Sequence, residues 1–245
     1  EIESIEALTS NDITDQIKKF SKNASSTNKV LIHIPSGTYT INNTAIYSNT
    51  AIVAENDTNL IASESAERMI RFADAENIMI YGGNWDAKFM NTNGIETNNA
   101  KNVKIENVTI QNANKYGMVF YNGSDVSLKN VKVKNNKDYG VYCQNSITTV
   151  QDSEITYNDC SGVAATGTAA KIYVKNNMLN NNGLNPRDTK EGQTGHGVAV
   201  QEGAYGEISG NTINDNKICG ISVSSDNATA IISNNQIYNN VRHGI

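Results

Sequence analysis

A glycine followed by an apolar residue returns at nearly constant intervals through most of the chain, and this period constrains the fold more than any other feature. The glycines are Gly94, Gly117, Gly140, Gly162, Gly197, Gly220 and Gly244. Their spacings are 23, 23, 22, 35, 23 and 24 residues. A second apolar series has nearly the same spacings and the same single interruption: Ile110, Val133, Ile155, Leu179, Ile213 and Ile237. Both series therefore indicate one repeated unit with one insertion of about a dozen residues.

Apolar and polar residues alternate within each repeat, as in Ile221-Ser222-Val223-Ser224. This period of two predicts strands rather than helices. A repeat of 22–25 residues with three short strands is one coil of a parallel β-helix, in which every strand pairs with its copies in the coils above and below. The predicted fold class is therefore all-β, a single-stranded β-solenoid in which equivalent residues stack in columns. Two interior columns are expected: Ile95, Met118, Val141, Val163, Val198, Ile221 and Ile245; and Phe120, Cys143, Ala165, Val200 and Val223.

Asparagine recurs between the strands, where a tight corner needs left-handed or bridging backbone that this residue tolerates. Two columns are predicted: Asn107, Asn130, Asp152, Asn176 and Asn234; and Asn112, Asn135, Asn181, Asp215 and Asn239. Stacked amides in such a column can also bond to one another.

Residues 1–27 are predicted to cap the first coil, and residues 28–245 to form the solenoid as a single domain. A helix is expected over residues 11–24, because Ile13, Ile17 and Phe20 share one face. Ser10 or Asn11 could cap its start. A cap is needed because the first coil would otherwise expose its core and its strand edges.

The overall charge of −5 argues against a nucleic-acid partner. There is no apolar run of 18 residues, so no membrane span is predicted. The three cysteines, Cys143, Cys160 and Cys219, have neither metal-ligand spacing nor pairs that would suggest a disulfide scaffold.

Two segments resemble a known family. Residues 30–39, Val-Leu-Ile-His-Ile-Pro-Ser-Gly-Thr-Tyr, resemble the opening of pectate-lyase-like proteins. Residues 80–86, Ile-Tyr-Gly-Gly-Asn-Trp-Asp, resemble a segment of polygalacturonases, and the later coils resemble mannuronan C5-epimerase repeats. The resemblance covers about residues 28–245 and implies a right-handed parallel β-helix that acts on polysaccharide. It also implies a bacterial protein at the cell surface or outside the cell.

In that family the Gly-led strand lines the substrate groove, so its outward residues are candidate sugar contacts. The first outward column is Glu96, Val119, Tyr142, Ala164, Ala199 and Ser222. The substrate-binding candidates are Tyr121, Tyr142, Gln144, Gln201 and Glu202. Tyrosine rings can stack on sugars, although ordinary packing along a column is an equal alternative.

The insertion, at about residues 183–195, is either a functional loop beside the groove or a tolerated surface insertion. It ends in Gly195-His196-Gly197, which resembles the Gly-His-Gly of polygalacturonases. Those hydrolases also need paired aspartates, but Tyr139, Cys160 and Ser161 stand at the matching positions. A glycoside hydrolase is therefore the second alternative only.

A lyase or epimerase acting on an acidic, uronic-acid-containing glycan is the main prediction. Such an enzyme must neutralise the substrate carboxylate and remove the neighbouring proton. The catalytic candidates are His196, Tyr139, Arg187 and Lys190.

Asp188, Glu191 and Glu202 could hold Ca²⁺ through hard oxygens. The epimerase motif Tyr-Gly-Phe-Asp-Pro-His is absent from the sequence. The first alternative function is a non-catalytic carbohydrate-binding or adhesive module of a larger surface protein.

Overall fold

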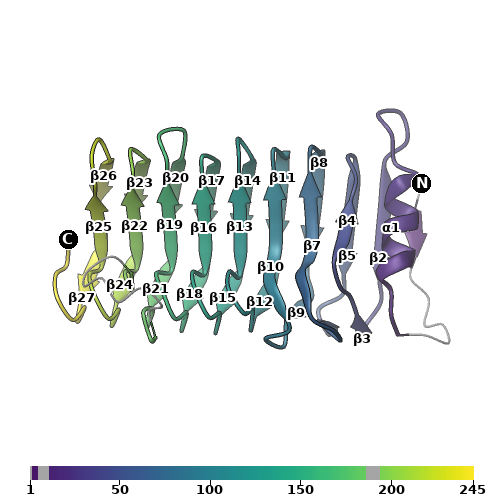
Figure 1. Ribbon diagram of the computed structural model, residues 1–245, viewed down its shortest axis with the longest axis horizontal. Coiled ribbons are helices and arrows are strands. Elements are labelled where there is room, and N and C mark those ends of the chain that lie inside the picture. Colours follow the sequence, from purple (N-terminus) through teal and green to yellow (C-terminus); the bar gives the residue numbers. More distant parts are fainter. Residues whose placement is uncertain (1, 5–10, 186–193) are drawn as a thin grey trace.

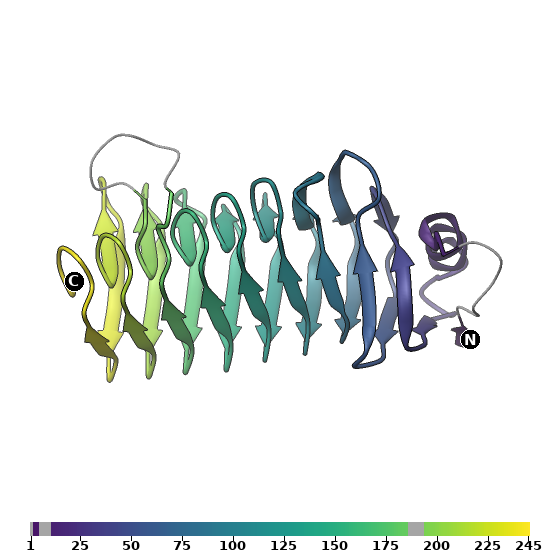
Figure 2. The same cartoon turned by 90° about the horizontal axis from the view of Figure 1, so that it is seen from below.

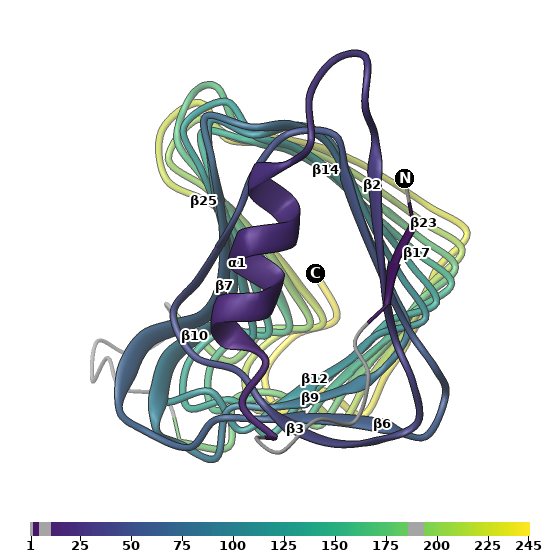
Figure 3. The same ribbon diagram turned by 90° about the vertical axis from the view of Figure 1, so that its right-hand side faces the viewer.

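The computed structural model describes residues 2–4, 11–185 and 194–245. These residues form one long parallel β-helix, in which successive coils stack along a single axis (Figure 1). Seen along that axis, each coil has three sides, and each side belongs to a different parallel sheet (Figure 3). The predicted all-β solenoid is confirmed.

Within the described residues, the strands of each sheet follow one another in chain order. Sheet 1 contains β1 (Ile2–Ser4), β2 (Val30–Ile34), β5 (Thr50–Ala54), β8 (Glu76–Tyr81), β11 (Lys101–Glu106), β14 (Asp125–Lys129), β17 (Ile147–Gln151), β20 (Lys171–Lys175), β23 (Tyr205–Ser209) and β26 (Thr229–Ser233). Sheet 2 contains β3 (Gly37–Thr40), β6 (Thr58–Ile61), β9 (Asn84–Asp86), β12 (Thr109–Gln111), β15 (Lys132–Lys134), β18 (Glu154–Thr156), β21 (Met178–Asn180), β24 (Thr212–Asn214) and β27 (Gln236–Tyr238). Sheet 3 contains β4 (Thr44–Ile46), β7 (Ala66–Ala73), β10 (Asn91–Asn98), β13 (Met118–Tyr121), β16 (Val141–Gln144), β19 (Val163–Thr166), β22 (Val198–Gln201) and β25 (Ile221–Ser224).

The register of sheet 3 is the one that the glycine spacing predicts. Ile95 pairs with Met118, Val141 with Val163, and Val198 with Ile221. The first interior column is fully buried from Ile95 to Ile221, and so is the second from Phe120 to Val200. Val223 departs from the pattern, with 38% of its surface exposed.

The corners between sheets turn through left-handed backbone, as the asparagine columns predict. In the first column φ lies between 51° and 56°, from Asn107 to Asn234. In the second column φ lies between 54° and 59°, from Asn112 to Asn239. Asparagine adopts this conformation at a lower cost than most residues, because its short polar side chain can bond locally.

A second set of asparagines, one position further along the chain, points inward at the same corners. The set between sheets 2 and 3 is Asn136, Asn158, Asn182, Asn216 and Asn240. Each of the first four donates both its backbone N–H and its side-chain amide to the Oδ1 of the next, at 2.8–3.3 Å. A similar ladder at the corner between sheets 1 and 2 runs through Ser153, Asn177, Asn211 and Asn235. These ladders satisfy corner N–H groups that would otherwise be buried without partners.

The Gly-led column is glycine because the ladder leaves no room for a side chain. A Cβ at Gly162 would lie 2.8 Å from the carbonyl oxygen of Gly197 and 2.9 Å from Nδ2 of Asn182. The same collision recurs at Gly140, where the ladder residue is Asn158. The recurring glycine and the inward asparagine are therefore two parts of one corner.

The N-terminal helix α1 (Thr14–Lys22) lies across the opening of the first coils (Figure 3). It is shorter than the expected 11–24, because residues 11–13 pair with the solenoid instead. Thr40 donates its N–H to the carbonyl of Asn11, and Ile13 donates to Thr40. The expected Asn11 cap is wrong, since Asp12 Oδ1 accepts the N–H of Thr14 at 2.9 Å, and Ser10 lies outside the described residues. The apolar face is as expected, with Ile13 and Ile17 buried against the core.

Replacing one ladder asparagine tests the role of these corners. In Asn158→Ala the buried N–H and amide of Asn136 lose their acceptor, and the carbonyl of Val133 loses its donor. We expect unfolding to become easier by about 3–5 kcal/mol, because each unsatisfied buried group costs about 1–3 kcal/mol. Denaturant titration followed by circular dichroism measures this loss.

The matched control is Asn135→Gly, at an exposed left-handed residue on the neighbouring coil. Glycine tolerates that backbone, so the control should change stability by less than about 1 kcal/mol. Equal losses in the two variants would show that the inward ladder does not contribute more to the free energy of unfolding than an exposed corner residue does.

Candidate functional site

Three tyrosine rings pack together where sheet 2 turns into sheet 3. Tyr116 and Tyr139 precede their Gly-led strands, and Tyr142 points outward from β16. The centroid of the Tyr142 ring lies 5.0 Å from that of Tyr116 and 5.1 Å from that of Tyr139, and both pairs are stacked. Tyr142 also shares a 3.0 Å hydrogen bond with the hydroxyl of Thr166. We call Tyr116, Tyr139 and Tyr142 the tyrosine cluster.

Burial keeps these phenols neutral. It raises the pKa of Tyr116 well above its ordinary value, and the nearby carboxylate of Asp138 raises it further. The pKa of Tyr142 is also raised, chiefly by burial and in part by the carboxylate of Glu202. At neutral pH both side chains can donate a hydrogen bond or a proton.

A buried carboxylate and two arginines lie on the same face, nearer the N-terminus. Glu96 is 6% exposed. Its Oε2 accepts from Arg68 Nε at 3.0 Å and from the Asn93 amide at 2.9 Å. Arg71 Nε lies 3.4 Å from Glu96 Oε1. We call Arg68, Arg71 and Glu96 the arginine–glutamate cluster.

Arg71 has capacity to bind an anion. Its side chain is 37% exposed, whereas those of Arg68 and Glu96 are 14% and 8% exposed. Its ion pair with Glu96 is made through Nε, and the contact between Nε and Glu96 Oε1 is not a hydrogen bond. The flat edge of the guanidinium therefore remains for a carboxylate, which it binds through paired hydrogen bonds.

Tyr121 lies near the arginine–glutamate cluster. Burial raises its pKa to about 12, the Glu96 carboxylate contributes to the rise, and the Arg68 guanidinium opposes it. The sequence suggested exposed rings at Tyr121 and Tyr142, but both are only partly exposed.

The first outward column is less open than expected. Val119, Ala164 and Ala199 point away from the core by strand alternation, yet each is fully buried. A second outward column consists of Asn98, Tyr121, Gln144, Thr166, Gln201 and Ser224, of which Thr166 is buried and the other five are partly exposed. The groups that this face presents to solvent are thus limited to the longer side chains that rise above the buried residues.

His196 is inside the protein rather than on its surface. It is 1% exposed, and its Nδ1 accepts the backbone N–H of Cys219 at 3.3 Å. Its own backbone N–H donates to Ser161 Oγ at 3.1 Å. Two coil steps separate it from Tyr139, which is roughly 10 Å along the axis. His196 and Tyr139 therefore lie in one row but not side by side, and their catalytic roles stay predictions.

The remaining catalytic and metal candidates lie outside the described residues. They are Arg187, Lys190, Asp188 and Glu191. Glu202 is described, and its side chain is exposed at the turn after β22. In the part of the chain that the structure describes, no three His, Cys, Asp or Glu side chains are grouped to hold a metal ion. A Ca²⁺ site remains a prediction from the sequence.

Two aspartates, Asp138 and Asp159, directly precede Tyr139 and Cys160 in the sequence, and both are buried at the corner between sheets 2 and 3. Asp138 is 8% exposed and Asp159 is 7% exposed. The Asp159 carboxylate pairs with Lys137 Nζ at 3.4 Å.

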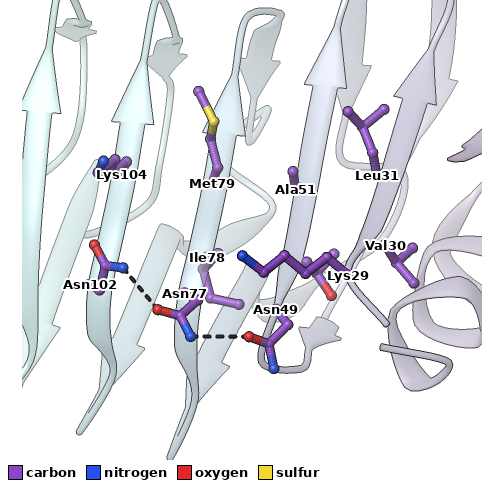
Figure 4. Close-up of a pocket in the computed structure, with 11 residues that line it drawn as sticks. Lys29, Val30, Leu31, Asn49, Ala51, Asn77, Ile78, Met79, Asn102 and Lys104 are labelled. Atoms are coloured by element: carbon purple, nitrogen blue, oxygen red, sulfur yellow. Dashed lines mark hydrogen bonds between the residues drawn. The ribbon is translucent and has the colours of Figure 1, made fainter. Parts of the chain in front are cut away.

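The structure also has a shallow hollow on the outer face of sheet 1 (Figure 4). Leu31, Ala51 and Met79 form one side of it, and a bonded row of Asn49, Asn77 and Asn102 forms the other (Figure 4). Among its lining residues, Lys29 and Lys104 are the ionisable ones. The hollow lies on a different sheet from Tyr121, Tyr142, Gln144 and Gln201, which are predicted site residues on strands of sheet 3.

Sequence reasoning missed Arg68 and Arg71 because the glycine repeat begins only at Gly94. The signal was nevertheless present. Ile70-Arg71-Phe72 alternates like the later strands, and an arginine between two core residues must point outward. Extending the outward column back by one coil would have found Arg71.

Raised tyrosine pKa values predict how stability changes with pH. Below about pH 10 the phenols are protonated in both the folded and the unfolded state. Between about pH 10 and 12 only the unfolded state loses these protons, so folding becomes less favourable as the pH rises. The denaturant midpoint should therefore fall over that range, and by less in Tyr116→Phe and Tyr121→Phe.

Ultraviolet titration of the folded protein gives a direct reading. A group of tyrosines should ionise later than the rest, and Tyr121→Phe should remove a transition near pH 12. If all 11 tyrosines ionised together at the ordinary pKa of about 10, the described burial would be contradicted.

The comparisons with solved structures show where this fold occurs. Pectate lyase Pel9A superposes with a TM-score of 0.68 at 15% identity, covering 85% of this chain and 62% of its own. An alginate lyase from Paenibacillus sp. str. FPU-7 gives 0.60 at 14% identity, covering 99% and 98%. The periplasmic alginate epimerase AlgG gives 0.59 at 16% identity, covering 81% and 48%. This chain thus spans about three fifths of the pectate lyase and half of the epimerase.

None of the curated proteins matches the sequence. In the described part of the chain, no helix has both the length and the apolar character to cross a membrane. A family model described as the right handed beta helix region matches residues 8–189. Since that match covers most of the chain, and the coils pair in the register described above, the protein belongs to the right-handed β-helix family.

Proposed function

We propose that this protein binds an acidic polysaccharide along the outer face of sheet 3 and acts on it as a lyase or an epimerase. The observation that carries the proposal is Arg71, whose exposed guanidinium lies on the same face as the tyrosine cluster. An arginine can bind a uronate carboxylate in a fork, and neutral phenols can donate to sugar oxygens. The fold shared with lyases and an epimerase of acidic polysaccharides is consistent with this function.

The polysaccharide would lie parallel to the helix axis. Arg71 on β7 and His196 before β22 are five coil steps apart, roughly 24 Å. Such a row is long enough for several sugar units. The predicted catalytic residues would then serve neighbouring sugars rather than meet at one atom.

Lyases and epimerases of uronates share their first step. A base removes the proton from the carbon beside the carboxylate, and the electron pair moves into the carboxylate that Arg71 neutralises. In a lyase the neighbouring C–O bond then breaks, and the departing oxygen takes a proton. In an epimerase a proton returns to the opposite face of the same carbon. Tyr139, the tyrosine of the proposed catalytic set, would donate that second proton.

Tyr139, His196, Arg187 and Lys190 remain the proposed catalytic set. Tyr139 is partly exposed beside Tyr142, so a sugar could reach it. His196 would need a movement of its neighbours, because it is 1% exposed. Ca²⁺ held by Asp188, Glu191 and Glu202 remains the proposed metal. Action on a polysaccharide also suggests that the protein works outside the cell or at its surface.

One observation favours the alternative, a carbohydrate-binding module without catalysis. Before it reaches the partly exposed Ser222, the first outward column has small buried residues at Ala164 and Ala199, near a buried His196. This stretch offers no accessible ionisable group among the described residues of that column. Binding without turnover is the outcome expected if this alternative holds.

Removing the guanidinium tests the substrate class. We expect Arg71→Ala to weaken binding of uronic-acid polymers by at least about tenfold, because a charge-assisted contact contributes about 1.5–3 kcal/mol. Isothermal titration calorimetry against polyuronates measures the change. Lys129→Ala removes the same charge from the exposed end of β14 on sheet 1 and should leave binding intact. Equal losses in both variants would indicate only a general charge effect.

Product analysis separates the possible reactions. A lyase gives an unsaturated product that absorbs in the ultraviolet, and an epimerase changes the nuclear magnetic resonance spectrum of the polymer without cleaving it. Tyr139→Phe and His196→Ala should each abolish turnover while retaining binding. Full activity in both variants would remove these residues from the mechanism.

A further inference from the structure

Two aromatic residues adopt left-handed backbone at the corner between sheets 2 and 3. Tyr157 has φ 56° and stands in the column where Asn112, Asn135 and Asn181 occupy the neighbouring coils. Phe89 has φ 55° in the turn that leads from β9 to β10. Bulky residues rarely adopt this conformation, whereas asparagine adopts it readily.

Both rings point into solvent rather than into the core. Phe89 is 45% exposed and Tyr157 is 47% exposed. Burial therefore does not compensate for the unfavourable backbone. Strained residues of this kind cluster at sites where they serve a ligand.

The turn that holds Phe89 is itself an addition to the coil. Eight positions separate Asp86 from Gly94, whereas six separate the paired Gln111 from Gly117. The longer turn is fixed by its own bonds: Phe89 donates its N–H to the carbonyl of Asn112 at 2.7 Å, and Met90 donates to Ala87 at 2.8 Å. The ring is thus presented by a defined turn.

Along the axis, Phe89 lies before the tyrosine cluster and Tyr157 lies after it, at the same corner between sheets 2 and 3. Three coil steps separate Phe89 from Tyr157, which is roughly 14 Å along the axis. Lys137 lies between them in the coil order. Its Nζ is 5.3 Å from the centroid of the Phe89 ring and 3.4 Å from Asp159 Oδ2, and its side chain stays 46% exposed in that ion pair. An ammonium beside an aromatic face matches an acidic sugar, whose C–H face can stack while its carboxylate meets the cation.

We infer that Phe89 and Tyr157 form two stacking subsites for separate sugar units of one polysaccharide chain, outside the row from Arg71 to His196. This inference rests on the proposed function for its ligand, but it assigns different residues and a different contact. Stacking on a sugar requires a flat aromatic ring at both positions and does not require the hydroxyl of Tyr157.

The test separates ligand binding from stability. Tyr157→Asn restores the residue type of the neighbouring coils, and Phe89→Asn introduces a residue that tolerates left-handed backbone, so the denaturant midpoint should stay unchanged or rise in both variants. Binding of the preferred polysaccharide should weaken about tenfold in each variant, since an aromatic face is lost. Tyr157→Phe should bind like the unaltered protein. Tyr47→Asn removes a ring that is 42% exposed at the corner between sheets 3 and 1, and should not affect binding.

Affinity is measured on a panel of polyuronates and neutral polysaccharides. Unaltered binding in Phe89→Asn and Tyr157→Asn would overturn the subsites while leaving the proposed function standing. If the protein prefers a neutral polymer, the acidic substrate fails, and the same variants still decide the subsites on that polymer. If no polysaccharide on the panel binds, both ideas are contradicted. Should an asparagine variant fail to fold, Tyr157→Gly and Phe89→Gly replace it.

Discussion

The contact between one coil and the next at the corner of sheets 2 and 3 is the constraint on which the structure depends. There an inward asparagine bonds to the asparagine of the following coil, and a glycine lets the two backbones approach. Any side chain at the glycine would collide with both neighbours. Because the contact repeats from the coil of Asn136 to the coil of Asn240, it holds the strands of sheet 3 in one register there and fixes which residues face outward.

The outer face of sheet 3 follows from that register. Residues far apart in the sequence come to lie in one row along the axis, as Arg71, Glu96 and Tyr142 do in the first outward column. Successive coils stack along the axis (Figure 2), so the residues of one column form a row instead of a single compact centre. A row of this kind suits a linear polymer, and it explains why the predicted catalytic residues are spread over several coils.

The sequence allowed the coil, its register and its left-handed corners to be predicted, because glycine, aliphatic residues and asparagine each recur at fixed positions. It did not reveal the buried ladder. Asn135 and Asn136 look alike in the sequence, and the corner between them interrupts the alternation that tells inside from outside. The helix was predicted too long, since nothing in the sequence shows that Ile13 would pair with Thr40.

The candidate site was predicted less completely than the fold. Tyr121, Tyr139 and Tyr142 were identified as candidates from their columns. Tyr116, which packs against Tyr139 and Tyr142, and the arginine–glutamate cluster were not. Side-chain burial was the main obstacle: His196 and Val119 occupy positions that strand counting assigns to the outside, yet both are buried. Arg187, Lys190, Asp188 and Glu191 lie outside the described residues, and their roles stay predictions.

A crystal structure with a bound uronate oligosaccharide tests the central claim most directly. The account predicts a chain of sugars parallel to the axis on the outer face of sheet 3, with one carboxylate paired to the Arg71 guanidinium. An oligosaccharide bound in the hollow of sheet 1, or lying across the coils without reaching Arg71, would contradict it.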